Sequence, residues 1–168
     1  MKSHLIKILL PLAIIAILSS QSIAASYKVT RVYDGDTVLC IKDSVQIKVR
    51  LVGIDAPETS KKKRDLGQPY SQLAQKYLAG LVLNKEVEIK GYGNDQYNRV
   101  LGEIYCDNKN INLEMIKAGL AESYKGKAAK GFNTDSYIAS EAEAKKTLKG
   151  MWSLGDKYIS PSDWRKIN

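Results

Sequence analysis

Three short segments with the alternating apolar pattern of β-strands follow one another closely. They cover residues 27–32, 37–41 and 46–52, and only polar turns at 34–36 and 42–44 separate them. Turns this short join neighbouring antiparallel strands, whereas a parallel crossover needs about a dozen residues or more. The fold is therefore expected to begin with a three-stranded antiparallel meander.

The rest of the chain alternates between helical and strand-like patterns. Apolar residues recur at three- and four-residue steps after Pro69, which suits the first turn of a helix. Asn112 is predicted to cap another helix, and Gly119 to end it in a left-handed conformation. We expect strands at 86–90 and 100–106, and helices at 69–82, at 112–118 and from 135 or 136 to 149.

Five strands and three helices, with most strands first, indicate an α+β domain. A five-stranded sheet that opens with a meander is consistent with a small Greek-key β-barrel of the oligonucleotide-binding (OB) type. We place this single domain at residues 25–155. The remainder, 156–168, is expected to be a short polar C-terminal tail.

The first 24 residues have the three parts of a secretory signal peptide. Lys2 and Lys7 form a basic start, residues 8–18 are apolar, and the small residues at 22–24 suit a cleavage site. The apolar run of about 11 residues is shorter than the roughly 20 that span a membrane. We expect cleavage after Ala24 and a secreted or periplasmic protein; the alternative is an uncleaved membrane anchor.

The charge of the chain points to a polyanionic partner. It has 26 Lys and Arg against 18 Asp and Glu, a formal charge of +8. Removing the leader takes away two lysines, which leaves 26 − 2 = 24 basic against 18 acidic residues, or about +6. Such a surface favours nucleic acid, or alternatively an anionic membrane surface or a cell-wall polymer.

Histidine and cysteine are too scarce for several kinds of site. The only histidine, His4, lies in the leader, which excludes a His base, a Ser–His triad and a His-ligated zinc or copper site. Cys40 and Cys106 cannot form a structural zinc site. Their strand parity suggests that both point into the barrel, where an oxidising compartment permits a disulfide; two buried thiols are the alternative.

Two carboxylates are expected at one mouth of the sheet. Asp36 starts the second strand and Asp55 follows the third, so antiparallel pairing brings them together. Two carboxylates and a backbone carbonyl are oxygen ligands that Ca²⁺ accepts. Pro57 fixes the backbone that follows, which aims Glu58 near the same site. The alternative for each aspartate is a turn-forming or capping residue.

Two arginines accompany these carboxylates. Arg50 lies on the strand that leads to Asp55, and Arg99 precedes the last strand. A guanidinium can hold two oxygens of a phosphate and stays charged at any pH. Two of them near a hard cation suit a phosphate group. A surface ion pair is the alternative for each arginine alone.

In this order and spacing, the motifs resemble those of the staphylococcal nuclease family of secreted phosphodiesterases. The resemblance extends from about Val32 to Ser153 and is carried by residues 32–38, 50–59, 95–105, 112–121, 140–146 and 151–153. It implies an OB-type barrel with three helices and one bound Ca²⁺. It also implies hydrolysis of DNA and RNA to products that end in a 3′-phosphate, by a protein that we expect to be a monomer.

The resemblance implies a role for each acidic motif residue. Asp36 and Asp55 correspond to the side-chain metal ligands. Ala56 corresponds to a ligand that binds through its backbone carbonyl; the family has threonine there, but a carbonyl ligand survives the change. Glu58 corresponds to the proposed general base.

Arg50 and Arg99 correspond to the two arginines that clamp the phosphate. Around them the sequence departs from the family pattern, since Tyr97 is kept but Gln96 replaces a lysine, and only Tyr124 stands where two stacking tyrosines are usual. Stacking is worth about 1 to 3 kcal/mol per base, so these departures concern the substrate rather than the chemistry.

Lys63 and Arg64 belong to a basic run at 61–64, which is either a solvated loop or an electrostatic guide for the incoming strand. Two other kinds of protein remain as alternatives. One is a non-catalytic OB module that holds single-stranded nucleic acid without cutting it, which predicts losses among the five charged motif residues; none is lost. The other is a basic protein that adheres to anionic envelope polymers.

Overall fold

The computed structural model describes residues 26–60 and 65–167. The expected leader, with its cleavage position, lies outside the described residues, as do Lys63 and Arg64. Within the described ranges, no helix combines the length and the apolar character needed to cross a lipid bilayer.

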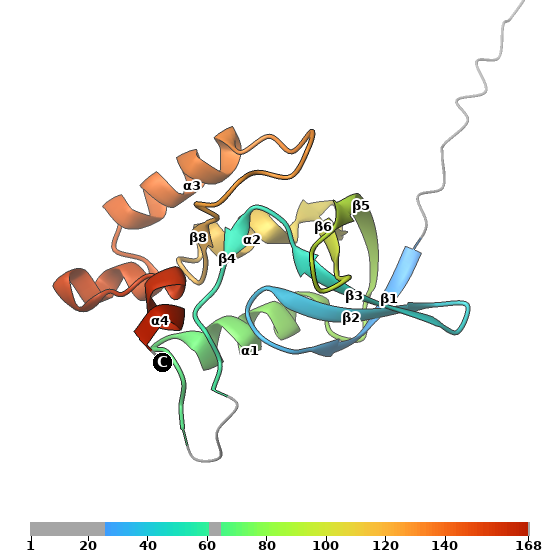
Figure 1. Cartoon of the computed structure of the whole chain (residues 1–168), viewed down its shortest axis with the longest axis horizontal. Coiled ribbons are helices and arrows are strands. Elements are labelled where there is room, and N and C mark those ends of the chain that lie inside the picture. The colour runs from blue at the N-terminus through green and yellow to red at the C-terminus, as the bar shows by residue number, and fades with distance from the viewer. Residues whose placement is uncertain (1–25, 61–64, 168) are drawn as a thin grey trace, which may run out of the picture.

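The chain begins with the predicted antiparallel meander (Figure 1). In the turn between the second and third strands, Asp43 and Ser44 have φ angles of 49° and 67°. Two left-handed residues match the twist of antiparallel strands, so they allow a two-residue connection. The three strands are β1 (Ser26–Val32), β2 (Thr37–Lys42) and β3 (Val45–Leu51).

Two more strands close the sheet into a barrel. β5 (Glu86–Asn94) pairs with β1, and β6 (Val100–Cys106) pairs with β5. β6 also runs parallel to β3, where Arg50 is opposite Leu101. The strand order β3-β2-β1-β5-β6, closed by this pairing, makes a five-stranded mixed barrel of the OB type and confirms the predicted fold class.

Three two-residue strands complete the described sheets: β4 (Ile54–Asp55), β7 (Lys109–Asn110) and β8 (Glu122–Ser123). β7 pairs antiparallel with the end of β6, and β4 pairs with β8 outside the barrel. The core fills the barrel with side chains that alternate along the strands and are fully buried: Val29, Val38, Val49, Leu51 and Ile104.

The three predicted helices are present as α1 (Ser71–Val82), α2 (Ile111–Lys117) and α3 (Asp135–Lys146). α1 starts two residues after Pro69, because Tyr70 has a left-handed backbone with φ of 72° that cannot belong to the helix. Along its inner face α1 buries Ala74, Leu78 and Val82.

The C-terminal end contains more helix than the sequence predicts. A 3₁₀ segment, η1 (Gly150–Lys157), is followed by α4 (Pro161–Ile167), so the expected polar tail is folded. Trp152 is buried and its ring centroid lies 4.6 Å from that of Tyr158, which fixes the start of this segment. Trp164 of α4 lines a small cavity together with Gln68 and Pro69, which precede α1.

The predicted cap of α2 is wrong by two residues. Asn110 caps the helix, since its side chain accepts a hydrogen bond from Leu113 N at 3.2 Å. Asn112 is buried in the first turn, where its amide donates to Val52 O at 2.9 Å and Gly102 O at 3.0 Å. Asn112 therefore links α2 to the barrel. Gly119 follows the helix with the predicted left-handed backbone, φ 66°.

Cys40 and Cys106 are both buried, and both are free thiols in the structure. Burial raises the pKa of Cys40 to about 12, which suppresses the reactive thiolate. Of the two alternatives considered for these residues, the structure has the buried thiols and no disulfide between them.

Candidate active site

The turn before β2 brings Asp36 to the mouth of the barrel. Its backbone carbonyl accepts a hydrogen bond from Leu51 N at 2.8 Å, so it lies beside the end of β3. Asp34 Oδ1 accepts from Asp36 N at 3.0 Å and keeps the turn tight. The Asp36 side chain is almost completely buried, with 6% of its surface exposed.

Asp55 reaches the same mouth from the short strand β4. This strand pairs with β8, where Asp55 is opposite Glu122. The next backbone amide, Ala56 N, donates to Asp36 Oδ2 at 3.2 Å and ties the two acidic segments together. The structure thus brings together the three residues for which the sequence predicts metal ligation.

Arg50 lies between the two aspartates. Its Nη1 is 2.6 Å from Asp36 Oδ1, and its Nη2 is 3.0 Å from Asp55 Oδ1. Burial alone would lower the pKa of Arg50, but the charges of the two carboxylates raise it above its usual value. The guanidinium is therefore permanently charged, and both partners hold its orientation.

Gln68 is hydrogen-bonded to the backbone of Glu58 and so closes the connection between them. Glu58 N donates to Gln68 Oε1 at 3.0 Å, and Gln68 N donates to Glu58 O at 2.9 Å. Gly67 has φ of 73°, and a Cβ atom there would lie 2.6 Å from Glu58 O. The connection therefore needs glycine at this position, and its closure positions Glu58 beside Asp55.

Arg99 lies in the connection between β5 and β6, directly before β6. Asp95 accepts hydrogen bonds from Arg99 N at 3.0 Å and from Arg99 Nε at 2.7 Å. Burial alone would raise the pKa of Asp95, but the hydrogen bonds from Arg99 outweigh burial, so the pKa of Asp95 is lowered. Arg99 also lies over the ring of Tyr97, 5.4 Å from its centroid.

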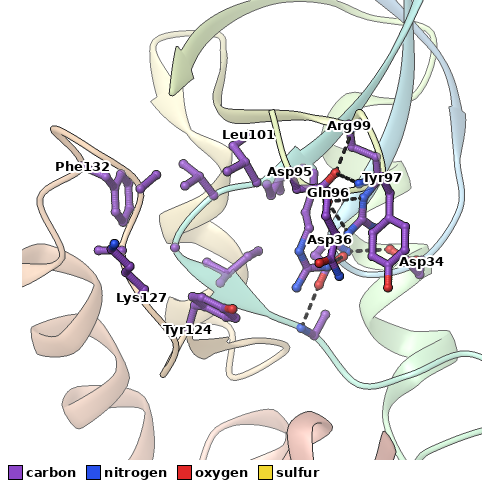
Figure 2. A pocket seen from close by; sticks show the side chains of 18 of the residues that line it. Asp34, Asp36, Asp95, Gln96, Tyr97, Arg99, Leu101, Tyr124, Lys127 and Phe132 are labelled. Carbon is purple, nitrogen blue, oxygen red and sulfur yellow. Dashed lines mark hydrogen bonds and ion pairs between the residues drawn. The ribbon is translucent and has the colours of Figure 1, made fainter. Parts of the chain in front are cut away.

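A cavity of about 700 Å³ lies at the candidate site. Arg50, Glu58 and Arg99 line it, together with Tyr97 and Tyr124. Figure 2 shows Arg99 and Tyr97 on the side of Asp36, whereas Tyr124, Lys127 and Phe132 stand across the cavity.

Both tyrosines that the sequence proposed for substrate binding are accessible, with 70% of Tyr97 and 44% of Tyr124 exposed. Lys63 and Arg64, the other two proposed residues, lie outside the described residues. Lys127 is a further cation on the cavity wall.

Sequence reasoning did not assign Arg165, which comes from α4. Its Nη2 is 2.7 Å from Asp55 Oδ2, its Nη1 donates to Asp55 Oδ1 at 3.1 Å, and Nη1 also pairs with Glu58. The hydrogen bond to Asp55 is the main cause of the raised pKa of Arg165. No motif marks this residue, because it lies in a segment that reads only as polar.

Asp34 is a second unassigned residue of the site, although its place in the Asp34-Gly35-Asp36 motif could have marked it. Burial, and then the charge of Asp36, raise the pKa of Asp34 to about 7. Crowded carboxylates of this kind repel one another unless a cation lies between them. Two guanidiniums, those of Arg50 and Arg165, supply positive charge to this acidic group.

The donor set fits a hard cation. Asp36 and Asp55 are buried carboxylates within the reach of one guanidinium, and Ala56, next to Asp55 in the chain, lines the cavity. Among the described residues, no three His, Cys, Asp or Glu side chains are grouped as a metal cluster. A cation here would therefore rely on two carboxylates, the Ala56 carbonyl and water, which suits Ca²⁺ better than a transition metal.

Comparisons with known proteins agree with this chemistry. The model of the family described as staphylococcal nuclease homologues matches residues 48–154. An uncharacterized endonuclease of Haemophilus influenzae is 37% identical over 140 residues, which are 83% of this chain and 72% of that protein. An uncharacterized endonuclease of Escherichia coli is 35% identical over 140 residues, 82% of this chain and 83% of that protein. A probable endonuclease of Phaeosphaeria nodorum is 37% identical over 124 residues, 70% of this chain but 42% of that protein.

Proposed function

Because the chain belongs to the family of staphylococcal nuclease homologues, we propose that it is a Ca²⁺-dependent phosphodiesterase that hydrolyses DNA and RNA. The observation that carries this proposal is that Asp36, Arg50, Glu58 and Arg99 line one cavity, and that Arg50 joins Asp36 to the buried Asp55. A buried acidic pair suits a hard cation, and flanking guanidiniums suit the oxygens of a phosphodiester.

Asp36, Asp55 and the Ala56 carbonyl would hold the cation. When bound, Ca²⁺ supplies a positive charge that polarises a phosphoryl oxygen and acidifies a coordinated water. Glu58 lies next to Asp55 and is 37% exposed, so its carboxylate can accept or orient a proton of the attacking water.

Arg50 and Arg99 act on the phosphate. Each is already oriented by a carboxylate, Arg50 by Asp36 and Arg99 by Asp95. Guanidiniums fixed in this way need little reorganisation when negative charge builds up on the phosphoryl oxygens. They therefore bind the transition state more strongly than the ground state, which is the condition for rate enhancement.

We further propose that the enzyme acts outside the cytoplasm, that single strands are its better substrates and that its products end in a 3′-phosphate. The leader-like pattern of residues 1–24 supports the first point. The exposed rings of Tyr97 and Tyr124 at the cavity support the second, because bases of a single strand can stack on them. The third follows from the family resemblance, and we expect a monomer.

One assay tests the proposed reaction. The chain from residue 25 is incubated with DNA or RNA in the presence of Ca²⁺ or a chelator, and cleavage is followed by gel electrophoresis. Cleavage should depend on Ca²⁺ and fall strongly in Asp36→Asn. The same change at Asp43, an exposed turn residue, is the control. Binding of the single strands without Ca²⁺-dependent cleavage would favour a non-catalytic binding module instead.

A further inference from the structure

The chain beyond the family match folds back onto the active site, and two contacts anchor it there. Tyr158 Oη donates to Glu122 Oε2 at 2.6 Å, and Glu122 is the strand partner of Asp55. Gln68 Nε2 donates to a backbone carbonyl at Ile159, at 2.7 Å. The C-terminal segment therefore contacts β8, the strand that pairs with β4, and Gln68, which is hydrogen-bonded to the backbone of Glu58.

Between these anchors and the end of the chain, α4 directs Arg165 at Asp55. Asp55 Oδ2 accepts from Nη2 at 2.7 Å, and Oδ1 accepts from Nη1 at 3.1 Å. Oδ1 also accepts from Arg50 at 3.0 Å. The Asp55 side chain is only 4% exposed, whereas that of Arg165 is 41% exposed. Two guanidiniums thus occupy both oxygens of a buried carboxylate, and the one from α4 is the more exposed, at 41% against 18% for Arg50.

We propose that Arg165 is a positioning residue of the active site that competes with the divalent cation for Asp55. The proposal rests on the proposed function, in which Asp55 is a metal ligand. A Ca²⁺ ion lies about 2.3 to 2.6 Å from its oxygen ligands, so it needs the lone pairs that the Arg165 guanidinium now uses. Two cations on one carboxylate also repel each other. Binding of the divalent cation therefore releases Arg165 from Asp55.

This competition couples the state of the general base to the cation. Arg165 Nη1 pairs with Glu58 as well as with Asp55. The Glu58 oxygen that accepts this hydrogen bond is occupied by the guanidinium, so the attacking water has less access to it. When Arg165 leaves Asp55, it loses the bidentate contact that also holds it against Glu58. Glu58 then becomes available to the water in the same event that loads the site.

Calcium titration calorimetry of the chain from residue 25, without nucleic acid, tests the competition directly. The variants are Arg165→Gln and Arg165→Lys. Lys166→Gln is the control, since it removes a charge from the next position of α4, where Lys166 pairs with Asp163 at 2.7 Å. Arg165→Gln should bind Ca²⁺ about tenfold more tightly, because the competing state is gone. Arg165→Lys should lie between it and wild type, since lysine keeps the charge but loses the bidentate fork.

A Kd for Ca²⁺ that is unchanged in Arg165→Gln would overturn the proposal. So would an Arg165→Lys variant that equals wild type while Arg165→Gln binds more tightly, because that pattern indicates long-range charge alone. If Lys166→Gln changed the Kd for Ca²⁺ as much as Arg165→Gln, this too would indicate long-range charge alone and overturn the proposal.

Hydrogen exchange on the unmodified protein gives a second readout that needs no Arg165 variant. Ca²⁺ should accelerate exchange of the backbone amides in α4 of the wild type, but not in Asp55→Asn. Unchanged or slower exchange in the wild type contradicts the release of Arg165.

The two proposals fail separately. Tighter Ca²⁺ binding by Arg165→Gln in a protein that cleaves no nucleic acid would leave the competition intact and overturn the nuclease function. Cleavage of nucleic acid together with an unchanged Kd for Ca²⁺ in Arg165→Gln would support the nuclease function and overturn the competition. Absence of Ca²⁺ binding in every variant overturns both the competition and the calcium dependence.

Discussion

Gly35 packs so closely against Ala56 that a Cβ atom at position 35 would lie 2.6 Å from the Ala56 Cβ. The same atom would lie 2.8 Å from the Cβ of Ala74 in α1. The turn before Asp36 is thus pressed against the segment after Asp55, and only glycine fits there. This contact lets Ala56 N reach Asp36 Oδ2 and keeps the two carboxylates at one site.

Gly35→Ala should separate these two segments. We expect it to lower the free energy of unfolding by about 2 kcal/mol, as overpacking does, and to reduce nuclease activity further than this loss of stability explains. Gly80→Ala is the matched control, because a Cβ atom at Gly80 in α1 would meet nothing within 4 Å. The control should stabilise the protein by about 1 kcal/mol and leave kcat unchanged. Chemical denaturation and initial rates provide the measurements, and a fully active Gly35→Ala would contradict the argument.

Activity should require Ca²⁺, and Mg²⁺ should support it poorly. Mg²⁺ demands near-octahedral geometry and gives up its water reluctantly, whereas Asp36 and Asp55 offer only two carboxylates. Initial rates with each ion at matched ionic strength, and in a chelator, check this prediction. Equal turnover with Mg²⁺, or full activity in the chelator, would remove the calcium assignment.

Arg50→Lys and Arg99→Lys should each lower kcat about a hundredfold while altering the free energy of unfolding far less. Lysine keeps the positive charge but lacks the planar fork that binds two oxygens. Arg31→Lys is the control, since Arg31 is exposed and lies over the Tyr33 ring, 4.7 Å from its centroid. Near-wild-type kcat in either test variant would exclude that arginine from the phosphate site.

Much of the fold could be predicted because local sequence patterns specify it. Short turns and alternating residues specify the meander, and the five main strands form close to where they were expected. The closing pair β3–β6 could not be read in this way, because it joins strands far apart in the chain. The capping of α2 by Asn110 was missed for a similar reason: Asn112, which has the same chemistry, is recruited by carbonyls of the barrel.

The residues of the candidate site differ in the same way: some follow from local patterns, and one depends on tertiary packing. Asp36, Arg50 and Asp55 lie next to turns and strand ends, so their meeting follows from antiparallel pairing. Arg165 comes from 110 residues beyond Asp55 in the sequence, and its contact depends on the packing of a helix that carries little apolar signal. Only tertiary structure places it there.

A buried glutamate should make stability depend on pH. Glu103 accepts hydrogen bonds from Tyr92 at 2.5 Å, Tyr137 at 2.8 Å and Asn110 at 3.0 Å. Burial alone raises the pKa of Glu103, but these donors lower it below its ordinary value of 4.5. A lowered pKa in the folded state stabilises the protein above pH 4.5, and this contribution is lost as the pH falls through the folded-state pKa.

Glu103→Gln should therefore lower the free energy of unfolding by about 2 kcal/mol at neutral pH, and by progressively less in acid. Glu143→Gln, at an exposed position of α3, is the control for removing a negative charge. Urea denaturation at a series of pH values measures the difference. A difference between Glu103→Gln and wild type that stays constant from neutral pH to pH 3 would rule out this account.

Single-stranded DNA and RNA should be cut faster than intact duplex. The cavity lies at the mouth of the barrel, with Tyr97 and Tyr124 exposed on its walls, and a base must leave its stack to lie on either ring. In a duplex this means local unpairing, which costs a few kcal/mol per displaced base. Within duplexes, cleavage should therefore concentrate in A·T-rich regions, which open most easily.

The strand preference is measured as kcat/KM at fixed salt for a G·C-rich duplex and for its separated strands. Salt must be held constant, because cations on the cavity wall, such as Lys127, make binding weaken as salt rises. Replacing Tyr97 with leucine should reduce kcat/KM for single strands by removing one stacking surface, a loss of about 1 to 3 kcal/mol of binding per base. Tyr77→Leu is the control, as a partly exposed tyrosine on α1 that is absent from the cavity wall. A higher kcat/KM for the G·C-rich duplex than for its separated strands would mean that the substrate enters without unpairing. It would also contradict the stacking role of Tyr97.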